Sequence, residues 1–335
     1  MSPENPFPPL TFFCELDEKP LRELFQKPGL IDELKALEAR IGLGLRDLSA
    51  GRAEVVQLLN RHEIPVTAWL LLPQEKGYWF NIDNVSDAAA FYGSFRNWTD
   101  AHQLKWDHIG LDIEPDIRFM ESLSANPLKS IAAVVRQYRP KAPFRQAVSQ
   151  YQDLVAAIHS DGYRVETYQF PLIRDERLAR SQILGRSLGL VDLAVNREVY
   201  MLYSSFYPDW GEGILWNYAR HAQAVAVGIT GGGIVMENLA SPDALTWEQL
   251  VRDLSIASYF TRHVYVFSLE GCVQHGYLKR LAELREEIPL PVRPASFGKI
   301  NLLRFMGRAA LRMVSRSLLY LGLLAAVVAA LILIF

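Results

Sequence analysis

Short apolar runs alternate with segments of helical periodicity along residues 10–290, and this alternation predicts the architecture. Runs rich in β-branched and other apolar residues predict eight strands, at 10–15, 41–46, 65–71, 108–113, 163–169, 199–204, 232–236 and 264–268. Apolar residues at helical spacing predict helices between and after them, at 30–38, 51–62, 87–103, 143–160, 213–227, 246–259 and 277–287. Eight strand–helix units in about 280 residues fit an α/β fold of the closed (β/α)8 type, the TIM barrel, better than an open sheet.

The seventh strand has two alternative positions. The helical spacing of apolar residues over 213–227 favours a helix that ends at Gly228, which places the strand at 232–236. Alternatively, 224–229 is itself the strand, and Thr230 and the three glycines after it form the functional turn.

Charge and hydropathy divide the chain into a barrel domain at 1–290, a basic segment at 291–316 and an apolar segment at 317–335. Up to residue 290 there are 29 basic and 37 acidic residues, whereas the last 45 residues hold six basic residues and no acidic one. Residues 317–335 carry no charge, and 19 residues of helix reach about 28 Å, close to the thickness of a bilayer's hydrocarbon core. We therefore expect a single C-terminal transmembrane helix.

The flanks of this segment predict its orientation. The N-terminal residues include Glu4 and several prolines, whereas a secretory signal needs a basic start and an apolar run. With the basic residues on the barrel side of the span, the positive-inside rule places the barrel in the cytoplasm. Cys14 and Cys272 are then expected as free thiols in a reducing compartment.

Four arginines recur every fourth residue in the basic segment, as Arg304, Arg308, Arg312 and Arg316. On a helix they form one stripe, which we expect to bind the anionic headgroups of membrane lipids. A solvated basic linker is the alternative. The whole chain has a net charge of −2 and a pI near 6.4, which argues against a nucleic-acid partner.

Acidic residues follow several of the predicted strands. In a (β/α)8 barrel the chemistry takes place where strands end and βα loops begin. The acids at these positions are Glu15, Asp47, Asp112, Glu114, Glu237 and Glu270. Carboxylates that converge on one barrel mouth raise one another's pKa, which is useful where a protonated acid is needed. A single acid such as Asp47 can equally be a helix cap.

The fourth predicted strand carries the most specific motif, Asp107-His-Ile-Gly-Leu-Asp-Ile-Glu114. Because side chains alternate along a strand, Asp112 and Glu114 both point into the barrel. The motif resembles Asp-x-x-Asp-x-Asp-x-Glu of glycoside hydrolase family 18, with Gly110 in place of the middle Asp. The Asp-x-Glu pair is also similar to that of the family 25 lysozymes.

The sixth predicted strand provides a second similarity to family 18. Its Met201-Leu-Tyr203-Ser204 resembles Met-x-Tyr-Asp, with Ser204 in place of the acid. The resemblance implies that Glu114 is the general acid, that Asp112 orients the substrate or stabilises positive charge, and that Tyr203 lines the site. A competing assignment pairs Glu114 with Glu237 on the seventh strand as the two catalytic carboxylates.

Aromatic and polar residues at the same end of the barrel complete the candidate site. Trp79 follows the third strand and Trp210 follows the sixth, where their rings could stack on sugars or simply pack the loops together. The full set of candidate substrate-binding residues is Glu15, Asp47, Trp79, Tyr168, Gln169, Tyr203, Trp210 and Glu270.

The leading hypothesis is a membrane-tethered glycoside hydrolase that needs neither a metal nor a cofactor. Its substrate would be a carbohydrate or a glycolipid at the inner leaflet. One alternative is a barrel enzyme of the phosphodiesterase or isomerase type, in which the acids bind Mg²⁺ or Ca²⁺. Another is a non-catalytic barrel that binds a carbohydrate or another ligand, which Gly110 and Ser204 favour because related enzymes have acids there.

Overall fold

The computed structural model describes residues 8–122, 127–234, 242–284 and 288–316. Eight parallel strands form a closed barrel in which each strand pairs with the next and the last pairs with the first, so the predicted (β/α)8 barrel is confirmed. The strands are β1 (Leu10–Cys14), β2 (Arg40–Leu45), β3 (Val66–Leu70), β4 (His108–Ile113), β5 (Arg164–Gln169), β6 (Arg197–Met201), β7 (Ala224–Gly228) and β8 (Val264–Phe267).

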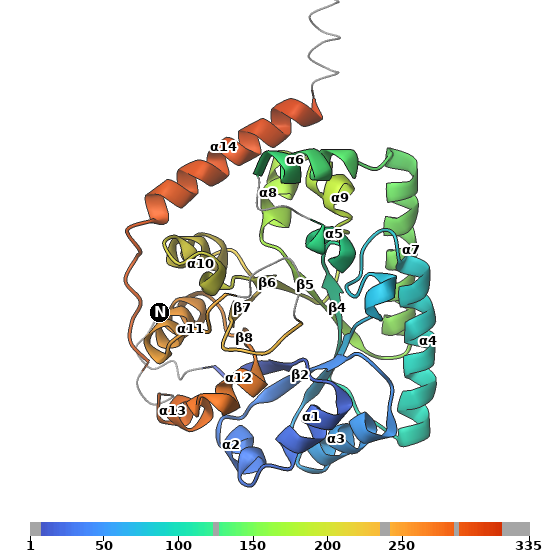
Figure 1. Ribbon diagram of the computed structural model, residues 1–335, viewed down its shortest axis with the longest axis vertical. Helices are drawn as coiled ribbons and strands as arrows, with labels where there is room; N and C mark the ends of the chain where they lie inside the picture. The colour runs from blue at the N-terminus through green and yellow to red at the C-terminus, as the bar shows by residue number, and fades with distance from the viewer. Residues whose placement is uncertain (1–7, 123–126, 235–241, 285–287, 317–335) are drawn as a thin grey trace, which may run out of the picture.

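Helices surround the strands as a ring (Figure 1). They are α1 (Glu18–Phe25), α2 (Leu30–Ala36), α3 (Ala50–Arg61), α4 (Val85–His102), α5 (Ile117–Glu121), α6 (Pro127–Arg136), α7 (Lys141–Ser160), α8 (Leu172–Ala179), α9 (Ile183–Leu188), α10 (Gly211–Ala219), α11 (Trp247–Phe260), α12 (Leu269–Gln274), α13 (Tyr277–Leu284) and α14 (Phe297–Ser315). Two short 3₁₀ turns, η1 (Gln74–Lys76) and η2 (Ser204–Phe206), follow β3 and β6.

The position of the seventh strand differs from the favoured prediction. The helix α10 ends at Ala219, and β7 occupies Ala224–Gly228, so the strand is not at 232–236. Barrel strands are buried on both faces and therefore read as continuous apolar runs, which helical spacing can mimic. Here Ala224 and Ala226 pack inside the barrel while Val225 and Val227 join the core beneath the helices. The alternative, with a strand at 224–229 and a turn of three glycines after it, is therefore correct.

An aromatic layer fills the inside of the barrel. The ring of Phe13 lies 5.1 Å from that of Trp69, 4.8 Å from that of Tyr168 and 5.4 Å from that of Tyr265, measured between centroids. Beneath this layer, the hydroxyl of Tyr265 donates to Glu166 Oε1 at 2.8 Å. Because these groups are buried and paired, the amino-terminal half of the barrel is closed, and the open space lies at the carboxyl ends of the strands.

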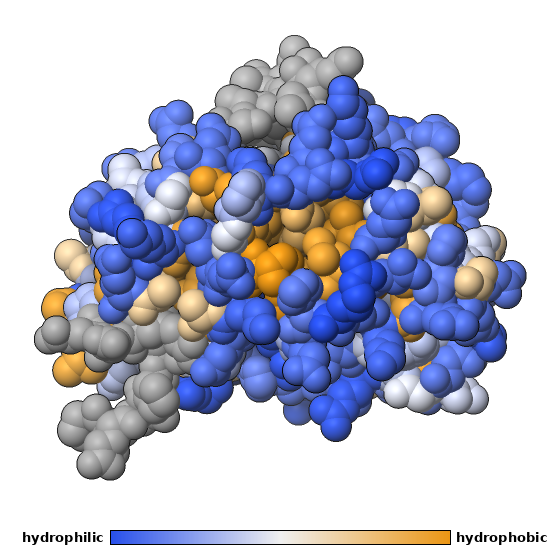
Figure 2. Space-filling view, turned by 90° about the horizontal axis from the view of Figure 1, so that it is seen from below, coloured by the Kyte–Doolittle hydropathy of each residue, from blue (hydrophilic) through white to orange (hydrophobic). Residues whose placement is uncertain are grey.

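The outer face of the ring is mostly polar. Figure 2 views the molecule from the lower edge of Figure 1, where α2 and α3 lie, and hydrophilic side chains there surround a central hydrophobic area. The helix α1 is an example of the pattern, since Leu21, Leu24 and Phe25 are its buried residues. The helices thus turn their apolar sides toward the strands.

The arginine stripe does not face outward as expected. The helix α14 packs against α8 and α10, as Figure 1 also shows, and Arg304 and Arg308 both contact Asp175 of α8. Arg312 Nη2 donates to the Leu178 carbonyl at 2.8 Å. These three side chains thus have partners in the barrel domain, and their binding to lipid headgroups stays a prediction.

No helix in the described part of the chain is both long enough and apolar enough to cross a membrane. The predicted transmembrane segment, 317–335, lies outside the described residues.

Candidate active site

Four carboxyl groups gather at the carboxyl ends of β1, β4 and β8. Glu15 follows β1, Asp112 lies in β4, Glu114 follows β4, and Glu270 is in the first turn of α12 after β8. Asp112 and Glu15 are buried, with 1% and 5% of their surfaces exposed. Since β1 and β8 are neighbours and β4 lies across the barrel, two pairs of acids face one another over the mouth.

Asp112 and Glu114 form the first pair. Trp69 Nε1 donates to Asp112 Oδ2 at 3.0 Å, and the two carboxyl groups hydrogen-bond to each other. Oδ1 of Asp112 is buried and has no other hydrogen-bond partner among the described residues. Two carboxyl groups can hydrogen-bond to each other only when at least one of them is protonated.

Burial is the main cause of the unusual titration of this pair. It raises the pKa of Glu114 to about 8, and the Glu15 charge adds to the shift while the hydrogen bond from Asp112 opposes it. Burial and the Glu114 and Glu15 charges together raise the pKa of Asp112 well above its ordinary range. Both effects follow from the cost of ionising an acid away from water beside other acids. The pair therefore carries at least one proton at neutral pH.

Glu15 and Glu270 form the second pair. The Tyr78 hydroxyl donates to Glu15 Oε1, and the Glu15 backbone N–H donates to Glu270 Oε1 at 3.3 Å. Burial raises the pKa of Glu15 to about 7, an effect that the Tyr78 hydrogen bond and the Arg46 charge limit. Burial also raises the pKa of Glu270 to about 7. Near neutral pH Glu15 is thus close to half ionised, and Tyr78 stabilises its anion.

The glycines after β7 cover the second pair. Gly232 and Gly233 have φ angles of +78° and +87°, which side chains other than glycine rarely adopt. A Cβ on Gly232 would lie 2.5 Å from Glu270 Oε1, and one on Gly233 would lie 3.0 Å from the Phe267 ring. The turn therefore needs glycine both for its backbone and for its close approach to the acids.

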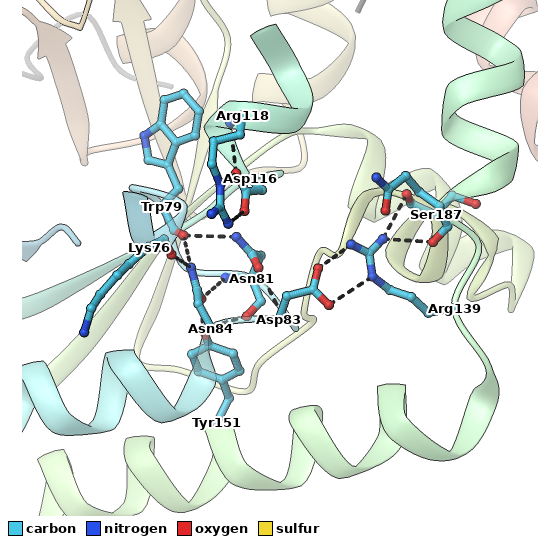
Figure 3. A network of polar contacts seen from close by, with 11 residues as sticks. Lys76, Trp79, Asn81, Asp83, Asn84, Asp116, Arg118, Arg139, Tyr151 and Ser187 are labelled. Carbon is cyan, nitrogen blue, oxygen red and sulfur yellow. Dashed lines mark hydrogen bonds and ion pairs between the residues drawn. The ribbon is translucent and has the colours of Figure 1, made fainter. Parts of the chain in front are cut away.

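A polar network holds the loop that carries Tyr78 and Trp79 (Figure 3). Asn84 Nδ2 donates to the Trp79 carbonyl at 2.8 Å and to the Lys76 carbonyl at 3.0 Å. The Tyr151 hydroxyl donates to Asn84 Oδ1 at 3.0 Å. The loop is thus fixed by α7 from behind, and it brings the Tyr78 hydroxyl to Glu15.

Two departures from the family 18 pattern have local causes. The Tyr168 ring occupies the space that a side chain at position 110 would need, so only glycine fits there. Ser204 donates its hydroxyl to Asp253 and accepts from Arg252 Nη2 at 3.1 Å, so its polar group is engaged with α11. Neither position contributes an acid to the mouth.

Six of the candidate residues line one cavity of about 1180 Å³. They come from the ends of β1, β3, β4 and β6 and from the loops after them: Glu15, Trp79, Asp112, Glu114, Tyr203 and Trp210. The Trp210 side chain is 47% exposed at the rim, whereas Trp79 is 7% exposed. The Tyr203 ring packs 5.8 Å from that of Phe267, and burial together with the nearby acids raises its pKa.

Four candidate residues are placed differently. Tyr168 belongs to the aromatic layer below the cavity, and Gln169 Nε2 donates to Thr167 Oγ1 at 3.3 Å on the other side of β5. Asp47 Oδ2 pairs with Arg52 Nη2 at 2.8 Å, and Asp47 Oδ1 accepts from the backbone N–H of Ser49, the N-cap of α3. Burial raises the pKa of Asp47, but the contacts with Arg52 outweigh it and hold the pKa at about 2. Glu270 lies behind the glycine turn rather than on the wall of the cavity.

Glu237, the proposed partner of Glu114 on the seventh strand, lies outside the described residues. Its assignment also assumed a strand at 232–236, whereas β7 ends at Gly228.

Sequence reasoning did not assign a role to Tyr78 or Trp69, although both contact an acid of the site. Trp69 lies on the same face of β3 as Thr67, and its ring packs in the cluster inside the barrel. No sequence signal predicts the Tyr78–Glu15 contact, because it depends on how the β3–α4 loop folds back over the mouth.

Among residues 8–122, 127–234, 242–284 and 288–316, no three His, Cys, Asp or Glu side chains gather closely enough to hold a metal ion.

No family model matches the chain, and no curated protein sequence matches it. Solved structures match it at the level of the fold. A xylose isomerase domain protein from Planctomyces limnophilus is 12% identical, with 84% of this chain and 99% of that chain covered at a TM-score of 0.47. The 3-keto-D-glucoside 4-epimerase of E. coli is 14% identical, with 82% and 99% covered at 0.41. A Rhizomucor miehei β-1,3-glucanosyltransferase in complex with laminaritriose is 9% identical, with 77% and 86% covered at 0.37.

Proposed function

We propose that the chain is a carbohydrate-active enzyme that cleaves a glycosidic bond with its carboxyl groups. The observation that carries this proposal is that Asp112 and Glu114 lie together on the wall of a large cavity, where burial raises the pKa of both. Glycoside hydrolysis needs an acid that is still protonated at working pH and a second carboxylate nearby. A pair of acids whose pKa values are both raised meets the first requirement, and Glu15 across the mouth meets the second.

Glu114 acts as the general acid in this proposal. Its proton passes to the glycosidic oxygen while the bond between that oxygen and the sugar carbon breaks, and the leaving group departs as an alcohol. The proton that Asp112 retains then donates a hydrogen bond to the new Glu114 carboxylate, which lowers the cost of ionising it in a buried site. Asp112 is held for this by the Trp69 indole.

Glu15 provides the opposing negative charge. It stabilises the positive charge that develops on the sugar ring. As the leaving group departs, Glu15 either takes a proton from the water that attacks the sugar carbon, or bonds to that carbon itself. In the second case water, which gives its proton to the Glu114 carboxylate, then displaces Glu15 from the sugar and completes hydrolysis. The Tyr78 hydroxyl and the nearby Arg46 favour its ionised form. Trp79 and Trp210 offer ring faces to the sugar on the cavity wall.

The experiment compares turnover of a panel of 4-methylumbelliferyl glycosides by the natural chain, by Glu114→Gln and by Glu23→Gln. Glu23 lies exposed on α1, so its variant is a matched control. We expect kcat to fall by at least about 100-fold in Glu114→Gln, as for loss of a general acid. Dinitrophenyl glycosides, whose leaving group needs little protonation, should lose much less. Equal turnover by Glu114→Gln and Glu23→Gln would remove Glu114 from the chemistry.

We further propose that the barrel is tethered to the cytoplasmic face of a membrane by 317–335. The support is the uncharged sequence of that segment together with the outward side of α14. Four large apolar side chains there, none of which lines the cavity, are between 57% and 67% exposed: Leu302, Phe305, Met306 and Met313. An apolar face beside an apolar anchor is typical of helices that lie on a bilayer.

A further inference from the structure

The cavity at the mouth is larger than the carboxyl groups require. From Glu15 and Asp112 it continues past Tyr203 and between α8, α10 and α14, and it ends near Val314. Pockets for small molecules usually span about 300–1000 Å³, so about 1180 Å³ exceeds the usual range. We call the part between α8, α10 and α14 the cavity arm.

One wall of the cavity arm is a stripe along α14. Leu303, Gly307, Ala310 and Val314 line the cavity at intervals of four, three and four residues, which places them on one side of the helix. From Leu303 to Val314 the helix rises by eleven steps, or about 16 Å along its axis. All four residues are apolar, and a Cβ on Gly307 would meet no atom within 4 Å, so open space lies beside it.

The opposite wall is also apolar. It is formed by Leu172 of α8, Ile183 and Leu184 of α9 and Ile214 of α10. Leu172 is 48% exposed. Apolar side chains that face each other across open space gain most from an apolar occupant, because both walls then lose contact with water.

The charged residues that α8 and α14 contribute to the lining, Asp175, Arg304 and Arg308, are paired with one another. Arg304 Nη2 lies 2.9 Å from Asp175 Oδ1, and its Nη1 donates to the Asn217 carbonyl at 2.6 Å. The Tyr218 hydroxyl donates to Asp175 Oδ2 at 2.5 Å. A polar ligand would therefore have to compete with buried contacts, whereas a hydrocarbon chain would leave them intact.

From these observations we propose that the substrate is an amphiphile, a carbohydrate linked to a long hydrocarbon chain. The sugar lies at Asp112 and Glu114, and the chain lies in the cavity arm between α14 and the helices α8 to α10. This inference rests on the proposed glycosidic function for the position of the sugar, and it assigns the substrate class of that same site.

The test measures binding of n-alkyl β-D-glucosides, from methyl to decyl and below their micelle concentrations, by the intrinsic tryptophan fluorescence of the full chain. Gly307→Phe fills the arm, and Gly298→Phe makes the same change on α14 away from the cavity, where a Cβ also meets nothing within 4 Å. Both variants replace a helical glycine and should favour the helix equally.

We expect affinity for the natural chain and for Gly298→Phe to rise by about fourfold for each methylene that enters the arm. In Gly307→Phe this rise should be lost. Affinity that is independent of chain length, or a rise that is equal in Gly307→Phe and Gly298→Phe, would overturn the proposal.

Glu114→Gln separates this inference from the proposed function. Its binding should keep the dependence on chain length, because the arm does not use the acid. If the dependence is present but no glycoside is turned over, the glycosidic function fails and the hydrocarbon site stands. If aryl glycosides are cleaved through Glu114 but chain length has no effect on binding, only the amphiphilic substrate is rejected.

Discussion

At the scale of single residues, the site is defined by acids that are kept from water. The pKa of Glu114 is about 8 in the folded chain, whereas its ordinary value is 4.5. The folded chain therefore binds this proton more tightly than the unfolded chain does. Folding stability from this proton is complete below about pH 4.5 and is lost as pH rises through 8. Glu15 and Glu270, whose pKa values are raised to about 7, contribute in the same direction.

We therefore expect the free energy of unfolding to decrease between pH 5 and pH 9. The decrease should be smaller in Glu114→Gln, which has no proton to lose. Urea denaturation at the two pH values measures both slopes, with Glu23→Gln as the control that keeps the natural slope. A slope in Glu114→Gln as steep as that of the natural chain would mean that Glu114 titrates normally.

Tyr78 offers a second test at this scale. Its hydroxyl stabilises the Glu15 anion, and Tyr78→Phe removes that hydrogen bond while keeping the ring. We expect the acidic limb of the pH–rate profile, which reports ionisation of Glu15, to move to higher pH, and kcat to fall about tenfold at neutral pH, since a hydrogen bond to a charged group contributes about 1.5–3 kcal/mol. Trp98→Phe on α4, remote from the cavity, is the aromatic control. An unmoved limb would assign the base to another group.

The residues of the site could be predicted only in part from the sequence. Strand alternation places Asp112 and Glu114 inside the barrel, and both line the cavity. Strand alternation does not reveal that Tyr168 lies one layer below the cavity. The depth of a side chain inside the barrel depends on the stagger of the strands. Asp47 satisfied the strand-end criterion, yet its neighbour Arg52 is fully buried and pairs with it.

At the scale of elements, α14 shows why a charge pattern needs a partner to be interpreted. A stripe of arginines predicts a surface for anions, but the sequence does not reveal that Asp175 lies in α8 at the matching place. The seventh strand shows the corresponding limit for apolar patterns. A buried strand such as β7 is rich in the same types of apolar residue as the end of a buried helix. Only the pairing of β7 with β6 and β8 shows that residues 224–228 form a strand.

The Asp175 contact predicts how α14 is attached. Arg304→Met leaves a buried Asp175 with only Arg308 as its cationic partner, and losing one partner of a buried pair typically destabilises by about 3–5 kcal/mol. We expect the amides of α14 to exchange with deuterium much faster, while those of β4 are unchanged. Arg316→Met removes the same charge at an exposed position and is the matched control. Equal exchange in the two variants would show that Asp175 does not anchor the helix.

At the scale of the whole molecule, α14 connects the cavity with the apolar segment. The helix forms one wall of the cavity, and residues 317–335 follow it in the sequence. The carboxyl groups lie at one end of the cavity and the stripe of α14 at the other. A membrane amphiphile could thus reach the acids from a bilayer without its hydrocarbon chain crossing open water, provided that 317–335 holds the barrel at the surface.

The tether can be tested with charges placed in the apolar segment. Ala326→Arg combined with Ala329→Arg should release the chain from the membrane fraction after an alkaline wash, since an arginine near the centre of a span is unfavourable by about 2.5–3.5 kcal/mol. Ala89→Arg combined with Ala101→Arg makes the same change on the exposed side of α4 and should leave the fractionation as it was. Release of the natural chain by the same wash would reject the transmembrane anchor.

The central claim is that the Asp112–Glu114 pair keeps a proton at neutral pH, and a ¹³C NMR titration of the glutamate side-chain carboxyl carbons tests it most directly. The Glu114 resonance is assigned by its absence from the spectrum of Glu114→Gln. Our account predicts that this resonance titrates near pH 8, well above the ordinary glutamate range. A midpoint near pH 4.5 would show that Glu114 is ionised at neutral pH, and the chain would then lack the acid on which the proposed reaction depends.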